Sequence, residues 1–114
     1  SIHQQIMFAE KSWGSFRVLD VEDASMTIKI TLTPGHGMNY HSHENRDEVW
    51  TIISGTGHAI LDGVRRDVKA GDILTMPAGC RHTVFADSEL KIIEVQLGSA
   101  ISVEDKQKYP LPQA

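Results

Sequence analysis

The chain has 114 residues and a formal net charge of −4 when its histidines are neutral. This length is typical of a single domain, and a hydrophobic content of 40% is enough to build one buried core. The acidic balance excludes a broad basic surface for nucleic acid or for anionic membranes, so we expect neither as a partner. An anionic ligand would have to be held by a few local cations or by a metal ion.

The cysteine content and the chain ends bear on where the protein works. Cys80 is the only cysteine, so no intrachain disulfide forms, and we predict a reducing, cytoplasmic location. There is no signal-peptide pattern and no apolar run long enough to span a bilayer. The sequence opens at Ser1 rather than at a methionine. We therefore expect residues 1–114 to form one domain, either alone or as a piece of a longer chain.

Short apolar runs separated by turn residues predict an all-β fold. Asp62-Gly63 is a strong two-residue hairpin signal, because both positions tolerate a positive φ. Strands at this regular spacing are typical of a sandwich or a barrel rather than of an α/β protein. The predicted strands are Phe16–Val21, Met26–Leu32, Met38–His43, Val49–Ser54, His58–Leu61, Val64–Lys69, Asp72–Met76, Arg81–Phe85 and Leu90–Leu97.

The last predicted strand, Leu90–Leu97, carries apolar residues on both of its faces. One face carries Ile93, Val95 and Leu97, and on the other face Ile92 is joined by Glu94 and Gln96. A strand that is covered on both sides needs a second sheet on one side and a further partner on the other. We predict that a second copy of the chain supplies this cover, which makes the protein a homodimer.

The segment after this strand predicts the one helix of the chain. Ser102 is a capping residue, and Asp105 is an acid three residues later, as at many helix starts. Pro110 and Pro112 would end the helix, because proline does not continue a helical backbone. The sequence therefore predicts a short C-terminal helix.

Two histidines placed two residues apart are the first sign of a metal site. Because side chains alternate along a strand, His41 and His43 point to the same face. Glu48, five residues further on, can return to that face through a short bulge or turn. Three convergent nitrogen and oxygen donors suit a divalent metal ion, for which we favour Zn and consider Mn, Fe, Co and Ni as alternatives.

These residues stand within two sequence signatures of a known family. The first signature is glycine, five residues, His-x-His, three or four residues, glutamate, six residues and glycine; it is matched by Gly35, His41, His43, Glu48 and Gly55. The second is glycine, five residues, Pro-x-Gly, two residues, histidine, three residues and asparagine; it is matched by Gly71, Pro77, Gly79 and His82, with Ala86 at the asparagine position. The sequence thus resembles a cupin. This resemblance implies a double-stranded β-helix, or jelly-roll barrel, with His82 as the fourth metal ligand.

A narrower resemblance extends from about Trp13 to Asp105. It is carried by Trp13-Gly14-Ser15, Glu48-Val49-Trp50, Ser54-Gly55-Thr56 and Ile93–Ser99. These segments resemble the type II mannose-6-phosphate isomerase family, whose cupin often forms the C-terminal domain of a bifunctional enzyme with a mannose-1-phosphate guanylyltransferase domain. The Arg-containing tail of that family is replaced here by Lys106–Pro110.

The resemblance implies a reaction, in which mannose 6-phosphate and fructose 6-phosphate are interconverted by moving a proton between C1 and C2. We predict that Glu94 relays this proton, because a carboxylate in an apolar pocket has a raised pKa. Gln96 shares the strand face of Glu94, and Trp50 shares that of Glu48, so both are predicted to contact the substrate. Arg46 precedes Glu48 and is predicted to hold the phosphate by paired hydrogen bonds.

Two other functions stay open at this point. One is a non-catalytic module that binds a sugar or nucleotide-sugar beside a mannose-1-phosphate guanylyltransferase, which the divergent tail favours. The other is a metal-dependent dioxygenase, since three histidines and a glutamate are compatible with iron. For individual residues, the alternatives are a structural hydrogen-bond network of Glu94 and Gln96 and simple core packing of Trp50.

Overall fold

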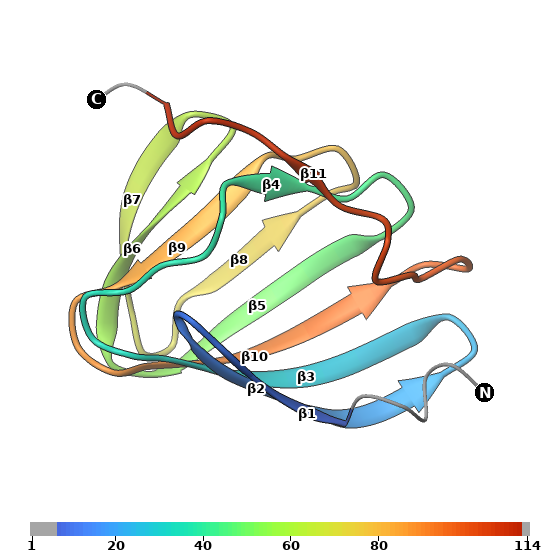
Figure 1. The fold of residues 1–114 in the computed structure, drawn as a ribbon, viewed down its shortest axis with the longest axis horizontal. Coiled ribbons are helices and arrows are strands. Elements are labelled where there is room, and N and C mark those ends of the chain that lie inside the picture. The colour runs from blue at the N-terminus through green and yellow to red at the C-terminus, as the bar shows by residue number, and fades with distance from the viewer. Residues whose placement is uncertain (1–6, 113–114) are drawn as a thin grey trace.

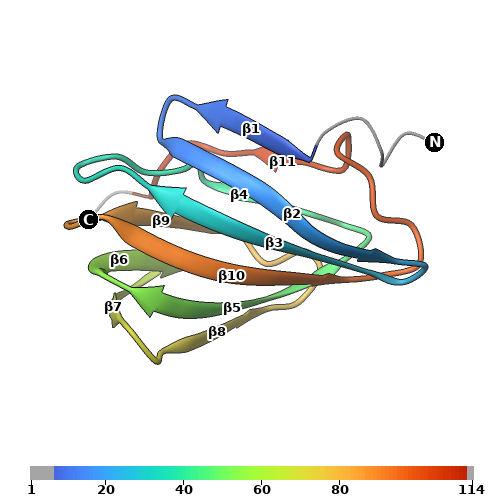
Figure 2. The same cartoon turned by 90° about the horizontal axis from the view of Figure 1, so that it is seen from below.

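Residues 7–112 are described by a computed structural model and form two antiparallel sheets (Figures 1 and 2). One sheet has the strand order β1-β2-β3-β10-β5-β8, and the other has the order β11-β4-β9-β6-β7. The strands are β1 (Phe8–Lys11), β2 (Gly14–Glu22), β3 (Ser25–Leu32), β4 (His41–Ser42), β5 (Asp47–Ser54), β6 (Thr56–Leu61), β7 (Val64–Lys69), β8 (Ile73–Met76), β9 (His82–Ala86), β10 (Leu90–Leu97) and β11 (Gln107–Lys108). The predicted all-β jelly roll is confirmed.

Alternating side chains of the central strands fill the space between the sheets. In β5, Trp50 and Ile52 are each only 1% exposed, whereas the residues between and beside them are less buried. Burying a large apolar side chain of this kind stabilises the fold by roughly 1.5–3 kcal/mol. The same inward set includes Glu48 on β5 and Glu94 on β10. The alternation that builds the core therefore also places two carboxylates inside it.

Two turns show why particular residues stand between the strands. Asp62 and Gly63 join β6 to β7 with φ values of 46° and 82°, which fits the predicted tight hairpin. Gly55 lies between β5 and β6 with a φ of 90°, and a Cβ there would sit 2.0 Å from the backbone oxygen of Glu89. Glycine at this signature position is thus required both by the backbone angle and by the close approach of another chain segment.

The predicted C-terminal helix is wrong. The backbone amide of Asp105 donates to the Ser102 carbonyl oxygen at 3.2 Å, which closes a turn rather than a helix. The chain then extends into β11, whose backbone pairs with β4. With Pro110 so close, the segment is too short for a stable helix, whereas pairing with β4 satisfies its backbone groups. No helix in residues 7–112 is long and apolar enough to cross a membrane.

The predicted strand Met38–His43 is mostly irregular. Only His41–Ser42 is a regular strand, and Gly37 makes a single bridge to Phe85. The carbonyl oxygen of Met38 accepts a hydrogen bond from the Thr83 hydroxyl at 2.6 Å rather than from a strand neighbour. The backbone amide of Met38 still donates to the Val84 carbonyl oxygen at 3.1 Å, so this segment is tied to β9 by mixed side-chain and backbone bonds just before the three histidines.

The outer face of the six-stranded sheet keeps exposed aliphatic residues. Ile53, Ile73 and Leu97 are 47%, 61% and 43% exposed, on β5, β8 and β10. This is the face for which the sequence predicts a second copy of the chain. The homodimer stays a prediction.

Candidate metal centre

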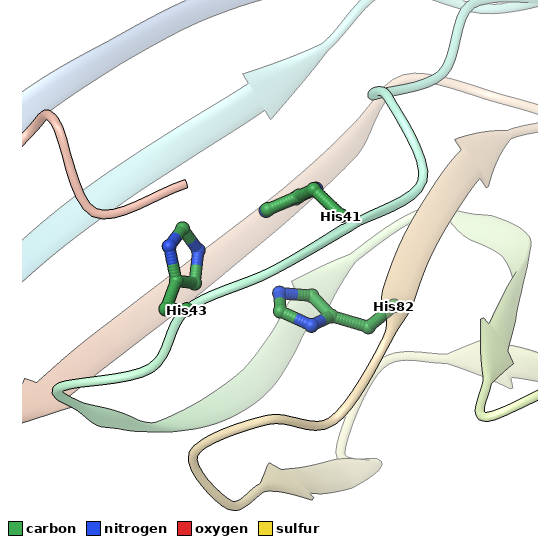
Figure 3. Close-up of side chains that lie close together, drawn as sticks. All are labelled: His41, His43 and His82. Atoms are coloured by element: carbon green, nitrogen blue, oxygen red, sulfur yellow. The ribbon is translucent and has the colours of Figure 1, made fainter. Parts of the chain in front are cut away.

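Three histidines converge from two neighbouring strands of the five-stranded sheet. β4 and β9 pair so that His41 lies opposite His82, and His43 follows directly after β4. Figure 3 shows the three side chains pointing toward one another. One ring nitrogen from each lies within 4.8 Å of the others, and all three residues are buried. The three histidines can therefore hold one metal ion.

Backbone carbonyl groups fix the orientation of each imidazole ring. The Nδ1 atoms of His41, His43 and His82 lie 2.6, 2.6 and 2.9 Å from the carbonyl oxygens of Asn39, Asp105 and Cys80. A carbonyl oxygen can only accept, so Nδ1 carries the proton and donates in all three rings. The Nε2 atoms are left facing the common centre. This is the supported tautomer that metal-binding histidines require.

Glu48 brings a carboxylate to the histidines from the opposite sheet. Its Oε2 lies 3.2 Å from His43 Nε2, and its Oε1 lies 3.3 Å from His82 Nε2. Among the described residues, Glu48 Oε1 and His82 Nε2 are buried without a hydrogen-bond partner. Buried polar atoms are rarely left unpaired, and a divalent ion between these atoms would satisfy both. The donor set therefore fits a metal, and Glu48 remains the predicted fourth ligand.

The protonation states at the centre are set by burial and by neighbouring charges. Burial, followed by the charge of His82, lowers the pKa of His41 to about 3. Burial also lowers the pKa of His43. Burial alone would lower the pKa of His82, but its hydrogen bonds and the charge of Glu48 outweigh burial and raise it. In the metal-free protein His82 therefore carries a second proton, on Nε2 facing Glu48, and metal binding must release this second proton.

Arg46 lies against the ligands rather than free at the site entrance. Its Nε donates to Glu48 Oε2 at 2.9 Å, and its Nη2 lies 3.1 Å from His43 Nε2. A third guanidinium nitrogen, Nη1, donates to the Ser102 carbonyl oxygen at 3.4 Å. The guanidinium thus contacts Glu48 Oε2 and His43 Nε2, two atoms that a metal would use as ligands. The prediction that Arg46 holds a phosphate stays a prediction, and it requires the guanidinium to leave this position.

This arrangement predicts that Arg46 opposes metal binding. We expect Arg46→Met to raise the affinity for a divalent metal by about tenfold or more, because hydrogen bonds to charged groups contribute roughly 1.5–3 kcal/mol each. Competition against a chromophoric chelator measures the change. Arg17→Met, on β2, is the matched control. An affinity equal to that of the control, or lower than that of the wild type, would contradict this role.

Glu94, Trp50 and Gln96 form a buried polar group beside the histidines. The indole Nε1 of Trp50 donates to Glu94 Oε1 at 2.7 Å, and the amide of Gln96 donates to Glu94 Oε2 at 2.6 Å. The Trp50 ring also packs edge-on against His82, with 5.5 Å between ring centroids. Burial, followed by the charge of Glu48, raises the pKa of Glu94 to about 7. The structure therefore brings Glu94, Trp50 and Gln96 into contact. The raised pKa places the titration of the Glu94 carboxyl group near neutral pH.

The raised pKa of Glu94 makes stability depend on pH. Because this pKa is higher in the folded than in the unfolded protein, the folded state binds more protons between about pH 4.5 and 7. Stability must then fall as pH rises through this window. Between about pH 4.5 and 7, we expect the free energy of unfolding of the metal-free wild type to fall by roughly 3 kcal/mol more than that of Glu94→Gln. Urea titrations at each pH measure it, and a constant difference between the two proteins would count against the buried carboxyl group.

Asp105 is a supporting residue that the sequence analysis did not assign to the site. Besides its carbonyl contact with His43, its carboxylate accepts the backbone amides of Glu44 and Asn45 at 2.9 and 2.8 Å. It therefore fixes both the second histidine and the loop that leads to Glu48. The sequence predicts a helix start here from Ser102 and Asp105, whereas the structure uses Asp105 to support the site.

The fold and the site together define a β-barrel protein with a buried cluster of three histidines that could hold a metal ion. A family model described as "Cupin domain" matches residues 28–96, which is more than half of the sequence. The chain belongs to the cupin family. The matched region contains all four predicted metal ligands, so the sequence signatures and the family model identify the same family.

Among characterised proteins, the chain is similar to enzymes of mannose metabolism and alginate synthesis. It is 26% identical over 97 residues to the mannose-1-phosphate guanylyltransferase of Klebsiella pneumoniae, covering 83% of this chain and 21% of that protein. It is 27% identical over 101 residues to the alginate biosynthesis protein AlgA of Pseudomonas putida, covering 87% of this chain and 21% of that protein. The chain thus spans about a fifth of the length of these relatives and is related to their cupin region.

Solved structures support the fold. An RmlC-like cupin from Shewanella frigidimarina superposes with a TM-score of 0.75 at 22% identity, and the match covers 92% of each chain. An oxalate decarboxylase from Bacillus subtilis superposes with a TM-score of 0.76 at 22% identity, covering 88% of this chain and 28% of that one. Likeness at this level of identity establishes the shared fold alone.

Proposed function

We propose that the chain is a metal-dependent sugar-phosphate isomerase that interconverts mannose 6-phosphate and fructose 6-phosphate. The observation that carries this proposal is Glu94, a buried carboxyl group beside the metal centre whose pKa is raised to about 7. A group that must both take and give a proton works best when its pKa lies near the working pH. The similarity to a mannose-1-phosphate guanylyltransferase supports mannose phosphate as the substrate class.

In this proposal the metal ligands are His41, His43, Glu48 and His82, and Zn is the favoured ion. A bound divalent metal would polarise the substrate oxygens and stabilise the negative charge that develops on them. The chain itself supplies the fixed Nε2 lone pairs and the Glu48 carboxylate. It also excludes bulk water, since all four side chains are almost fully buried.

Glu94 performs the proton transfer. Its carboxylate takes the proton from C2 of the open-chain aldose as that C–H bond breaks, which gives a cis-enediolate with the negative charge on the C1 oxygen. The hydroxyl proton moves from the C2 oxygen to the C1 oxygen, and Glu94 returns its proton to C1 to form the new C–H bond of the ketose, so that no oxidant or reductant is needed. Trp50 and Gln96 hold the two carboxylate oxygens and keep Glu94 aimed into the barrel. Both side chains are also candidates for contact with the sugar.

A non-catalytic sugar-binding module is the alternative that one observation favours. The guanidinium of Arg46 is hydrogen-bonded to Glu48 and lies against His43, which holds two predicted ligands away from a metal. The metal-loaded chain should convert mannose 6-phosphate to fructose 6-phosphate and stop doing so in excess chelator. Saturable binding of mannose 6-phosphate without turnover would instead establish the binding module. The homodimer and the cytoplasmic location belong to this proposal as predictions.

A further inference from the structure

The C-terminal segment brings lysines to the face that carries the metal-binding histidines. β11 pairs with β4 so that Lys108 lies opposite His41 and Gln107 lies opposite Ser42. Residues directly opposite each other in an antiparallel pair point to the same face, so Lys108 shares the face of His41. Lys106 directly precedes β11, two residues before Lys108, so extending the strand alternation by one residue brings it to the same face. Figure 1 shows β11 lying alongside β4 at the edge of its sheet.

Electrostatic effects agree with this placement. The charge of Lys106 contributes to the lowered pKa of His41. The pKa of Lys106 is itself lowered, first by burial and then by the charges of Lys108, Lys11 and Arg46. Lys11 belongs to β1 in the other sheet, so the lysines approach the site from both sheets. Clustering of like charges is unfavourable without an anion, and this chain is acidic overall.

We propose that Lys106, assisted by Lys11 and Lys108, binds the phosphate group of the sugar phosphate while the sugar end lies at the metal centre. The identity of the substrate in this inference rests on the proposed function, but the lysines are separate from the predicted metal ligands and from Glu94. Ammonium groups suit a phosphate dianion, whose charge would relieve their mutual repulsion. Because Arg46 is already bonded to Glu48, the proposal assigns the phosphate to the lysines.

The test compares Lys106→Gln with Lys29→Gln, a matched change on β3 away from the cluster. We expect Lys106→Gln to raise the KM for mannose 6-phosphate by about tenfold or more while kcat stays within about twofold, as for loss of one charge-assisted hydrogen bond. Lys106→Arg should restore most of the loss. A KM for Lys106→Gln equal to that of Lys29→Gln would overturn the assignment.

A second measurement separates this inference from the proposed function. Binding of inorganic phosphate to the chelator-treated protein, followed by phosphorus NMR, needs neither metal nor turnover. Loss of this binding in Lys106→Gln but not in Lys29→Gln supports the lysine site even if the chain does not isomerise sugars. Equal phosphate binding by both variants, or none by the wild type, overturns it. Thermal unfolding of each variant checks that the fold is retained.

Discussion

Replacing His82 with alanine should abolish stoichiometric binding of a divalent metal and, with it, the proposed activity. His82 Nε2 is buried and unpaired at the centre, and its ring is held by the Cys80 carbonyl group. Removing a residue that only hydrogen-bonds to a metal ligand weakens metal binding roughly 10–100-fold. Removing the ligand itself should weaken metal binding more. Elemental analysis after dialysis against a fixed low metal concentration measures the bound ion.

His36→Ala is the control for this experiment, because His36 is exposed and lies outside the cluster. It should bind one metal per chain, as we expect of the wild type. His41→Ala should behave like His82→Ala, which guards against a defect specific to one position. Full metal occupancy in both of these alanine variants would show that the ion, if any, binds elsewhere.

Replacing Glu94 with glutamine should lower kcat by about 10²–10⁴-fold, which is the usual contribution of a positioned acid–base group. The amide keeps the size of the carboxyl group and can still accept from Trp50, so the pocket should keep its shape. Metal binding and the KM for mannose 6-phosphate should therefore stay close to the wild-type values. Steady-state kinetics of the metal-loaded variant measure the split between kcat and KM.

Glu89→Gln provides the matched control, since Glu89 is exposed in the turn before β10. Its kcat should equal that of the wild type. If Glu94→Gln also retained its kcat within a fewfold range, the Glu94–Trp50–Gln96 group would be a structural hydrogen-bond network, as the simpler alternative holds. The pH dependence of stability described above would still identify the buried carboxyl group.

The sequence was most informative where function depends on local spacing. His41 and His43 are two residues apart, and Gly55 forms a turn within a few residues. Both features depend on neighbouring residues, so the sequence alone predicts them. The alternation in β10 likewise predicted that Glu94 and Gln96 share a face. Their contact with Trp50 then followed from strand pairing, which the structure supplies.

The features that sequence patterns missed depend on contacts between distant residues. The carbonyl oxygen of Asp105 holds a histidine 62 positions away, and no periodicity encodes such a contact. β1 and β11 are short edge strands with exposed polar residues, so neither shows the alternation of a buried strand. The position of the Arg46 guanidinium is set by its contacts with His43, Glu48 and Ser102. These contacts exist only in the folded chain, so the sequence pattern does not predict them.

The most direct test of the central claim is a proton NMR measurement of mannose 6-phosphate in D₂O with the metal-loaded chain. Isomerisation through a carboxylate relay predicts that fructose 6-phosphate forms only with metal present and carries some deuterium at C1. Deuterium enters because Glu94 can exchange its proton before returning it. Absence of any conversion with Zn, Mn, Fe, Co or Ni, while mannose 6-phosphate still binds, would contradict the isomerase and leave a sugar-binding cupin.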